Sequence, residues 1–279
     1  MLTRLRLPSG LRIRRAADNA TNEPRTEIMY DSATRFALND ETTVLFMSQL
    51  PLRARASAAE GGSEPDGSLS RVNIVAAGLG LGGIGVWSMH FVGMLALKLD
   101  LATGYALLET LASLLAAVVV ASLAFMFVGR DPRLGRITLA GCVLGLGVAV
   151  MHYLGMFGMR FGGYTQWNSG IVALSVLIAM AAASAALWLA FNTPTLTFRV
   201  AAAMVMGIAV CSMHYTGMVA ADFICTTTDR GKLPSGFGVI SAADLPVLVL
   251  TISIGLAAVI AVDLLLQNLL GNEAAAKVG

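Results

Sequence analysis

The sequence predicts an all-α protein, a polytopic membrane helical bundle in which six transmembrane helices are arranged as three repeated helical hairpins. Two properties of the chain support this prediction. Apolar residues make up 56% of the chain and charged residues only 13%, whereas soluble domains are about one quarter charged. In addition, the apolar residues after position 71 form six long runs, and one short motif recurs in every second run.

The six apolar runs are long enough to span a membrane as helices. Each exceeds the roughly 20 residues that a helix, rising about 1.5 Å per residue, needs to cross the hydrocarbon layer. The core of a soluble protein would not produce six runs of this length with so few ionisable groups. The predicted helices are Val72–Leu97, Tyr105–Val128, Ile137–Met159, Gly170–Phe191, Val200–Ala221 and Leu245–Leu270.

The basic residues of the connecting segments predict an orientation. Cytoplasmic loops carry an excess of Lys and Arg, and here that excess lies on the side that holds both chain ends. We therefore expect a protein of the bacterial inner (plasma) membrane with both termini cytoplasmic. The cytoplasmic set is Arg53, Arg55, Arg71, Arg130, Arg133, Arg136, Arg199 and Lys277, and the outer set is Lys98, Arg160, Arg230 and Lys232.

Residues 1–71 differ from the rest of the chain. They are polar, their basic start is not followed by the apolar region of a signal peptide, and their best apolar stretch, Thr43–Leu52, has about half the length of a membrane span. We expect 1–71 to be a disordered N-terminal segment, with a short amphipathic helix on the membrane surface as the alternative. Residues 72–270 are predicted to form the transmembrane domain and 271–279 a short cytoplasmic tail.

A six-residue motif, Met-His-aromatic-x-Gly-Met, occurs three times and contains all 3 histidines of the chain. The step from His90 to His152, and again from His152 to His214, is 62 residues. Self-similarity at a fixed period identifies a repeated structural unit. Each copy lies near the outer end of an apolar run, so the unit is predicted to be a hairpin of a motif helix and a return helix. The copies are Met89–Met94, Met151–Met156 and Met213–Met218.

The motif predicts a metal site. Its histidine and second methionine are four residues apart and share one face of a helix, whereas the first methionine points about 100° away. An imidazole within a membrane span is costly without a partner and by default marks a functional site. Three imidazoles with thioethers suit copper, since thioethers favour Cu(I) and imidazole binds either copper state. The candidate ligands are His90, Met94, His152, Met156, His214 and Met218, and then Met89, Met151 and Met213.

A packing interpretation stays open beside the metal site. A histidine on an apolar helix can be a hydrogen-bonded packing residue, a methionine can fill space, and membrane glycines such as Gly141 and Gly145 let helices approach closely. The aromatic position is equally open. Tyr153 and Tyr215 either support the site by hydrogen bonds or belong to the interfacial aromatic belt, and Phe91 has no hydroxyl.

Other classes of site are disfavoured. The net charge of +2 does not suggest a nucleic-acid partner. Cys142, Cys211 and Cys225 lack the spacing of a disulfide framework or a thiolate zinc site. The third outer loop, Asp222–Asp244, is longer than the other two, and it either caps the site or is an insertion that a surface loop tolerates.

The tripled motif resembles the MHYT family of bacterial integral-membrane sensor domains, and the resemblance covers about residues 72–270. It implies copper held at the outer face by the motif residues, with O2, CO or NO as the sensed gas, and no enzymatic activity in the domain itself. The family usually has a further helix before the first motif, for which 1–71 offers no equivalent. Since only Gly271–Gly279 follow the last helix, we expect the signal to pass to a separate cytoplasmic protein.

Three functions follow from these observations. The first is a sensory module in the lipid bilayer that binds copper. The alternative is a copper transporter or membrane copper chaperone, which would need polar or thioether groups at several depths, and for which Met204 and Met206 are the candidates. The third is a His-ligated haem protein, which ranks last because two haem ligands would leave one histidine over and no c-type attachment motif is present.

Overall fold

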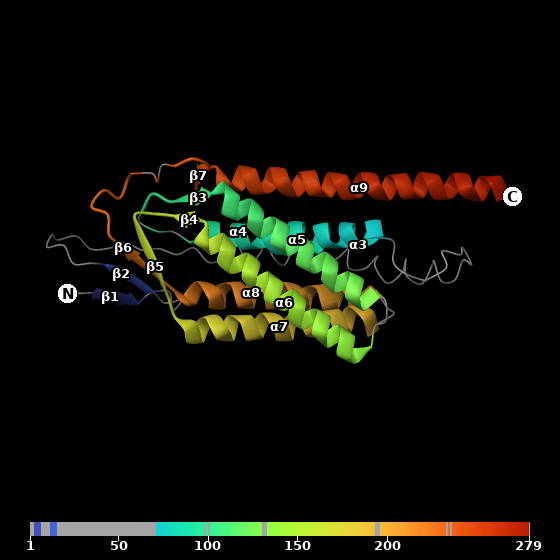
Figure 1. Cartoon of the computed structure of the whole chain (residues 1–279), viewed down its shortest axis with the longest axis horizontal. Helices are drawn as coiled ribbons and strands as arrows, with labels where there is room; N and C mark the ends of the chain where they lie inside the picture. The colour runs from blue at the N-terminus through green and yellow to red at the C-terminus, as the bar shows by residue number, and fades with distance from the viewer. Residues whose placement is uncertain are drawn as a thin grey trace.

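The computed structural model describes residues 3–6, 12–15, 71–97, 99, 101–129, 133–192, 196–232, 234 and 236–278. In this part of the chain, long helices form a bundle and short strands gather at one end of it (Figure 1). The helices are α3 (Arg71–Gly78), η1 (Leu79–Trp87), α4 (Ser88–Leu95), α5 (Leu107–Gly129), α6 (Leu134–Phe157), α7 (Ser169–Asn192), α8 (Leu196–Val219) and α9 (Leu245–Val278). The strands are β1 (Thr3–Arg6), β2 (Arg12–Arg15), β3 (Gly104–Ala106), β4 (Met159–Arg160), β5 (Gly163–Trp167), β6 (Ala221–Cys225) and β7 (Val239–Ser241).

Five helical segments in the described residues are long and apolar enough to cross a membrane, which confirms the prediction of a multi-pass membrane bundle. The first of them joins α3, η1 and α4. The apolar part of α8, Ala203–Val219, is shorter, so a sixth span is not established by length and composition. The five spans are Val72–Leu95, Leu107–Gly129, Leu134–Phe157, Ser169–Asn192 and Leu245–Gln267.

The first span is not a uniform α-helix, because its centre, η1, is a π-helix. This segment, LGLGGIGVW, is rich in glycine, and π-helical turns occur mostly as short insertions within α-helices, often at functional sites. At its end the Ser88 hydroxyl donates a hydrogen bond to the Ile84 carbonyl. The π-helix therefore leads directly into α4, the segment that carries the first motif.

Small residues set the close approach of neighbouring helices, as the sequence predicted for Gly141 and Gly145. A Cβ at Gly141 would meet the backbone of Ser184, and one at Gly145 would meet the backbone of Ala179, in both cases within 3.0 Å. These contacts join α6 to α7. Gly82 lies equally close to the Ala117 backbone and joins η1 to α5. Such approaches replace the hydrophobic driving force that helices lack in lipid.

The helices do not form three equivalent hairpins. The first return helix, α5, packs between the first span and α6, and α7 packs between α6 and α8. In the described residues, however, the extensive contacts of α9 are with η1 and α4 rather than with its own motif helix, α8. The strand before α9 explains this, because β7 pairs with β3, the strand that follows α4, and so anchors the start of α9 beside the first span.

The prediction of an all-α protein is corrected by two small sheets, with strand orders β1-β2-β6-β5 and β4-β3-β7. The strand pairing repeats with the 62-residue period of the motif. Tyr105 pairs with Met159, and the residues 62 positions later, Trp167 and Ala221, also pair with each other. A search for apolar runs of helix length does not detect strands this short. The loops that follow the motif helices thus bind one another through backbone hydrogen bonds, and the strands lie at the end of the bundle where the motif helices end (Figure 1).

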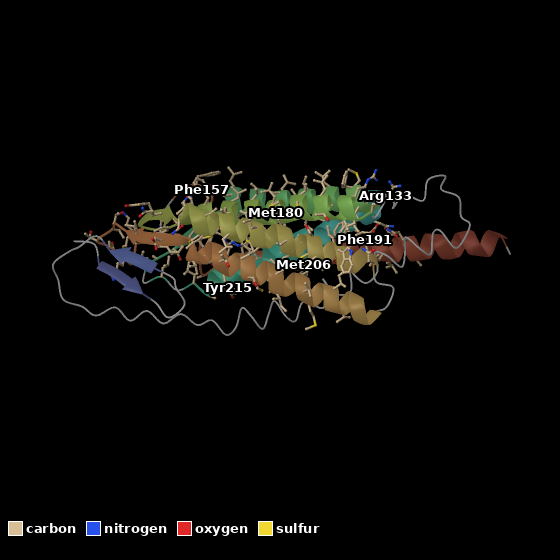
Figure 2. All side chains as sticks on the ribbon, turned by 90° about the horizontal axis from the view of Figure 1, so that it is seen from below. Arg133, Phe157, Met180, Phe191, Met206 and Tyr215 are labelled. Carbon is tan, nitrogen blue, oxygen red and sulfur yellow. The ribbon has the colours of Figure 1, made fainter. Side chains whose placement is uncertain are left out.

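The ends of the chain also differ from expectation. Thr3–Arg6 and Arg12–Arg15 are strands, and β2 runs parallel to β6, where the sequence suggested a segment without secondary structure. The rest of residues 1–70 lies outside the described residues. At the other end, α9 does not stop at Leu270 but continues as a helix to Val278 and extends past the other helices (Figure 1). The side chains of Arg133 and Phe157 mark the two ends of α6 (Figure 2).

Candidate metal centre

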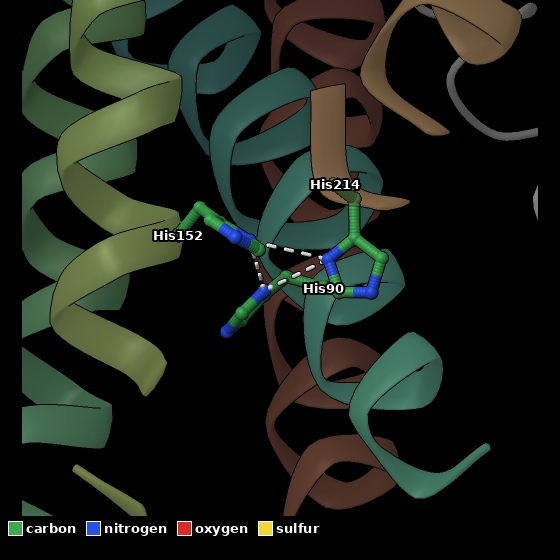
Figure 3. A group of neighbouring side chains, drawn as sticks. All are labelled: His90, His152 and His214. Carbon is green, nitrogen blue, oxygen red and sulfur yellow. Dashed lines mark hydrogen bonds between the residues drawn. The ribbon is translucent and has the colours of Figure 1, made fainter. Parts of the chain in front are cut away.

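The three histidines of the motif meet at one point inside the bundle (Figure 3). His90 comes from α4, His152 from α6 and His214 from α8. The Nδ1 atom of His90 lies 3.1 Å from that of His152 and 3.2 Å from that of His214, and 3.2 Å separates the Nδ1 atoms of His152 and His214. The triangle is nearly equilateral, so the predicted convergence of three imidazoles is what the structure contains.

All three rings are buried, with exposed fractions of 0% or 1%. Their planes stand nearly perpendicular to one another, with interplanar angles of 79° to 84° between the three pairs. His90, His152 and His214 form the group in the described residues that could hold a metal ion, because their ligand nitrogens all lie within 4.8 Å of one another.

Hydrogen bonds between neutral imidazoles cannot account for all three Nδ1 contacts of the triangle. A neutral imidazole carries one N–H shared between two ring nitrogens, so each Nδ1 is either a donor or an acceptor. If one Nδ1 donates, the other two face each other with lone pairs, and if two donate, their hydrogens face each other. At most two of the three short contacts are then hydrogen bonds. A cation at the centre would accept all three lone pairs at once.

The size of the triangle fits a transition-metal ion. The centre of an equilateral triangle with this side lies about 1.8 Å from each corner, close to the roughly 2.0–2.1 Å of a zinc–imidazole bond. Imidazole is a ligand for zinc, copper, iron and nickel alike, so the three nitrogens suit a transition-metal ion without selecting which one.

The other nitrogen of each ring has no partner. His90, His152 and His214 all bury Nε2 without a hydrogen bond in the described residues. A buried donor left unpaired costs about 1–3 kcal/mol, and metal-bound histidines usually donate this hydrogen to a carboxylate, carbonyl or water. A metal bound through Nδ1 would leave these three costs in place, so the discrimination between the functional and the packing interpretation rests on the Nδ1 triangle.

Each Nε2 instead points at the glycine of a neighbouring motif. His90 faces Gly155 and His152 faces Gly217, in both cases through Nε2. His214 faces Gly93 in the same way. Sequence reasoning gave these glycines no role. Their identical place in all three copies, three residues after each histidine, was the available signal.

The aromatic residue of each motif contacts the histidine beside it. Phe91, Tyr153 and Tyr215 lie edge-on to the neighbouring imidazole, with ring centroids 4.7, 4.9 and 5.2 Å apart. The Tyr153 hydroxyl, however, forms a 2.6 Å hydrogen bond with the Ser175 hydroxyl of α7. Its ring also contacts Trp167 in β5. The position thus supports the imidazole through ring packing, which Phe91 can supply as well as a tyrosine.

The motif methionines belong to the hydrophobic core or pack against it. Five of the six are buried, and the role of all six as ligands stays a prediction. Met89 is the one of the six that is only partly buried. The buried methionines are Met94, Met151, Met156, Met213 and Met218.

The acidic residues near the end of the bundle that holds the strands serve other contacts or stay unassigned. Glu109, at the start of α5, forms an ion pair with Arg160 of β4, which ties the loop after the first motif to the loop after the second. Tyr105 of β3 is buried, and burial raises the pKa of Tyr105. Asp222 lies in β6 and pairs in register with Gln166 of β5. These residues lie at the end of the bundle where the motif helices end.

Comparison with known proteins identifies the repeat. The family model described as "Bacterial signalling protein N terminal repeat", MHYT, matches residues 83–141 and 145–203. Each matched segment contains one copy of the motif and begins at a glycine seven residues before its histidine. No solved structure matches the chain.

Several curated proteins share this region. The bifunctional diguanylate cyclase/cyclic di-GMP phosphodiesterase MucR of Pseudomonas aeruginosa is 40% identical over 197 residues, which cover 67% of this chain and 27% of MucR. The cyclic di-GMP phosphodiesterase NbdA of the same organism is 40% identical over 149 residues, 50% of this chain and 18% of NbdA. The signalling protein YkoW of Bacillus subtilis is 32% identical over 149 residues, 50% of this chain and 18% of YkoW.

The chain therefore spans between 18% and 27% of the length of these relatives. The enzymatic activities in their names belong to whole proteins of which this chain matches a minor part. What the chain shares with them is the repeat with its histidine motif. The chain belongs to the MHYT family of bacterial signalling proteins.

Proposed function

We propose that the protein is a membrane sensory module whose three motif histidines bind one copper ion. The triangle of Nδ1 atoms carries this proposal, because no distribution of protons over three neutral rings turns all of its contacts into hydrogen bonds. A metal ion at the centre would instead accept one lone pair from each ring, and it would also explain why three separate repeats each contribute one buried imidazole.

Copper is preferred over zinc because of the surroundings of the triangle. Met94, Met156 and Met218 are buried one helical turn beyond the histidines, and thioethers favour Cu(I). Zinc can use three histidines but gains little from methionine. The bound metal would supply an open coordination position for a diatomic gas such as O2, CO or NO, and the chain's own part is to hold the imidazoles and exclude water.

The signalling role rests on family membership. Relatives that share the repeat are named as signalling proteins and as enzymes of cyclic di-GMP metabolism. We propose that this chain acts likewise at the inner membrane, with six spans and both termini in the cytoplasm, and passes its signal to a separate protein there. The output requires two states of the bundle whose metal or gas contacts differ.

A copper transporter or membrane chaperone is the second candidate. Its support would be a line of metal-binding side chains through the membrane. Of the two methionines considered for it, Met206 is buried but Met204 is 51% exposed on the surface of α8. A transport pathway therefore receives less support than a single centre near one end of the helices.

Metal analysis of the purified chain tests the proposal. Protein extracted in detergent and loaded with Cu(I) under reducing conditions should retain about one copper ion per chain after dialysis. The variant His90→Ala/His152→Ala/His214→Ala should retain almost none, while Met204→Ala, which changes an exposed methionine, should bind like the parent. Copper retention by the triple variant, with its thermal transition intact, would disprove the proposed centre.

Cell copper content separates a sensor from a transporter. Deleting or overproducing a sensor should leave total cell copper unchanged, whereas a transporter should shift it in opposite directions in the two strains. A shift in copper content that disappears in the triple histidine variant would favour the transporter.

A further inference from the structure

A closed cycle of contacts joins the three repeats at the candidate metal centre. The ring nitrogen of each histidine that faces away from the triangle, Nε2, enters a notch in the next motif helix, and the floor of each notch is a glycine. The three pairs are His90 with Gly155, His152 with Gly217, and His214 with Gly93. They run in one direction, from α4 to α6, from α6 to α8 and from α8 back to α4.

A side chain at any of these glycines would collide with the imidazole. A Cβ built at Gly93, Gly155 or Gly217 falls within 3.0 Å of the facing Nε2, a separation that real Cβ atoms essentially never show. At Gly155 the same Cβ would also crowd the end of the Phe91 ring, at 3.3 Å. The notch exists only because the motif has glycine there.

The notch decides which nitrogen is available to a ligand. Nε2 is at the far end of a histidine side chain and Nδ1 is nearer the backbone, so a ring with free space ahead of it can present either nitrogen. Here the far end is enclosed by the neighbouring helix, and Nδ1 faces the centre in all three rings. The triangle of Nδ1 atoms thus depends on three glycines that belong to other repeats.

We infer that Gly93, Gly155 and Gly217 are positioning residues that impose Nδ1 ligation on the metal centre, each acting on the histidine of a neighbouring repeat. This role extends the proposed function, and its effect on metal binding rests on that proposed function. The packing itself is a property of the protein without metal. Each glycine therefore acts on a histidine 65 or 121 residues away in the sequence, not on the histidine of its own motif.

A double-mutant cycle in metal-free protein tests the packing. Gly155→Ala should lower the thermal transition of the purified chain, and most of the loss should disappear in the His90→Ala background, where only the milder contact with Phe91 remains. The same loss should persist in the His152→Ala background, although His152 is in the same motif as Gly155. Gly135→Ala is the matched control, because Gly135 lies in the same helix with no atom within 4 Å of an added Cβ.

Two outcomes decide the packing test. Rescue by His90→Ala and not by His152→Ala supports the inference, also when Gly155→Ala alone fails to accumulate in membranes and the double variant restores it. Equal loss in both backgrounds, or no loss at all, would overturn it, because glycine would then serve ordinary helix packing.

Nitrogen-15 NMR of labelled histidine tests the ligation mode. In the copper-loaded chain, all three rings should show a metal-bound Nδ1 and a protonated Nε2. Gly155→Ala should change the signals of one ring, that of His90, and lower copper affinity about tenfold or more, as loss of a supporting contact does. Metal bound through Nε2 in any ring would contradict the inference while leaving the copper centre itself in place, whereas absence of copper from the parent would refute the proposed function.

Discussion

The motif helices and the return helices differ in the relation between burial and hydropathy. The described spans that carry motifs, Val72–Leu95 and Leu134–Phe157, have mean hydropathies of 1.5 and 1.9 and are 61% and 56% buried. The return spans Leu107–Gly129, Ser169–Asn192 and Leu245–Gln267 have mean hydropathies of 2.6, 2.3 and 2.6 but are only 33%, 28% and 17% buried. The more apolar helices are the more exposed ones.

This order follows from the solvent. In water the most apolar helix would be the most buried, but lipid is as apolar as a leucine side chain, so burial in a membrane requires small residues and polar partners instead. The motif helices have both, in their glycines and in the buried His90, His152 and His214. The return helices face the lipid and pack against the motif helices. The three histidines of the candidate metal centre all lie on the motif helices.

The largest expected effect is on copper affinity, which should differ between a variant of a motif helix and a variant of a return helix. His152→Ala removes one of three ligands on a motif helix and should lower copper affinity about a hundredfold or more, beyond the loss seen when only a supporting contact is removed. Trp188→Ala, on the return helix α7, removes a large side chain that is 48% exposed and should leave affinity unchanged. Competition with a Cu(I) chelator measures both, and similar affinities for the two variants would remove the distinction.

The next effect concerns stability. Gly145→Ala places a methyl group against the Ala179 backbone of α7 and should cost about 1–3 kcal/mol, as overpacking typically does. Gly135→Ala in the same helix meets no atom within 4 Å and should be neutral or slightly stabilising, because alanine favours a helix over glycine. Denaturation in mixed detergent measures both, and equal losses would show that close approach between α6 and α7 is not what the glycine provides.

These stability effects were partly visible in the sequence. The spacing of Gly141 and Gly145 predicted helix packing, and the tripled motif predicted that His90, His152 and His214 would converge, because repeats place equivalent residues at equivalent positions. The orientation of the rings was not predictable, since it depends on Gly93, Gly155 and Gly217 from other repeats. The strands of the outer loops were also missed, because they pair between loops that are far apart in sequence.

The departure from three equal hairpins has a similar cause. Repeats of equal length suggest equal packing, but the contacts of α9 with η1 and α4 depend on β7 pairing with β3, a long-range contact with no periodic pattern. The π-helix η1 was not predicted either, since glycine-rich apolar sequence also suits an ordinary membrane helix. What the sequence fails to reveal here is how the packing of one repeat differs from the packing of the others.

The smallest effect tests the link between the two classes of helix. Tyr153→Phe removes the hydrogen bond from motif helix α6 to Ser175 of return helix α7 and should cost about 1 kcal/mol. Copper stoichiometry should be unchanged, because the ring that packs on His152 is retained and the first repeat already has Phe91. A variant with normal stability but impaired copper binding would instead give the phenol a direct role at the centre.

X-ray absorption at the copper edge tests the central claim, that three imidazoles from three repeats hold one metal ion. Spectra of the loaded chain should fit three nitrogen neighbours with the multiple scattering of imidazole at about 2.0 Å, as in other metal–imidazole sites, with or without a sulfur neighbour from methionine. A shell with fewer than two imidazoles, or a spectrum that is the same in the triple histidine variant, would contradict the account.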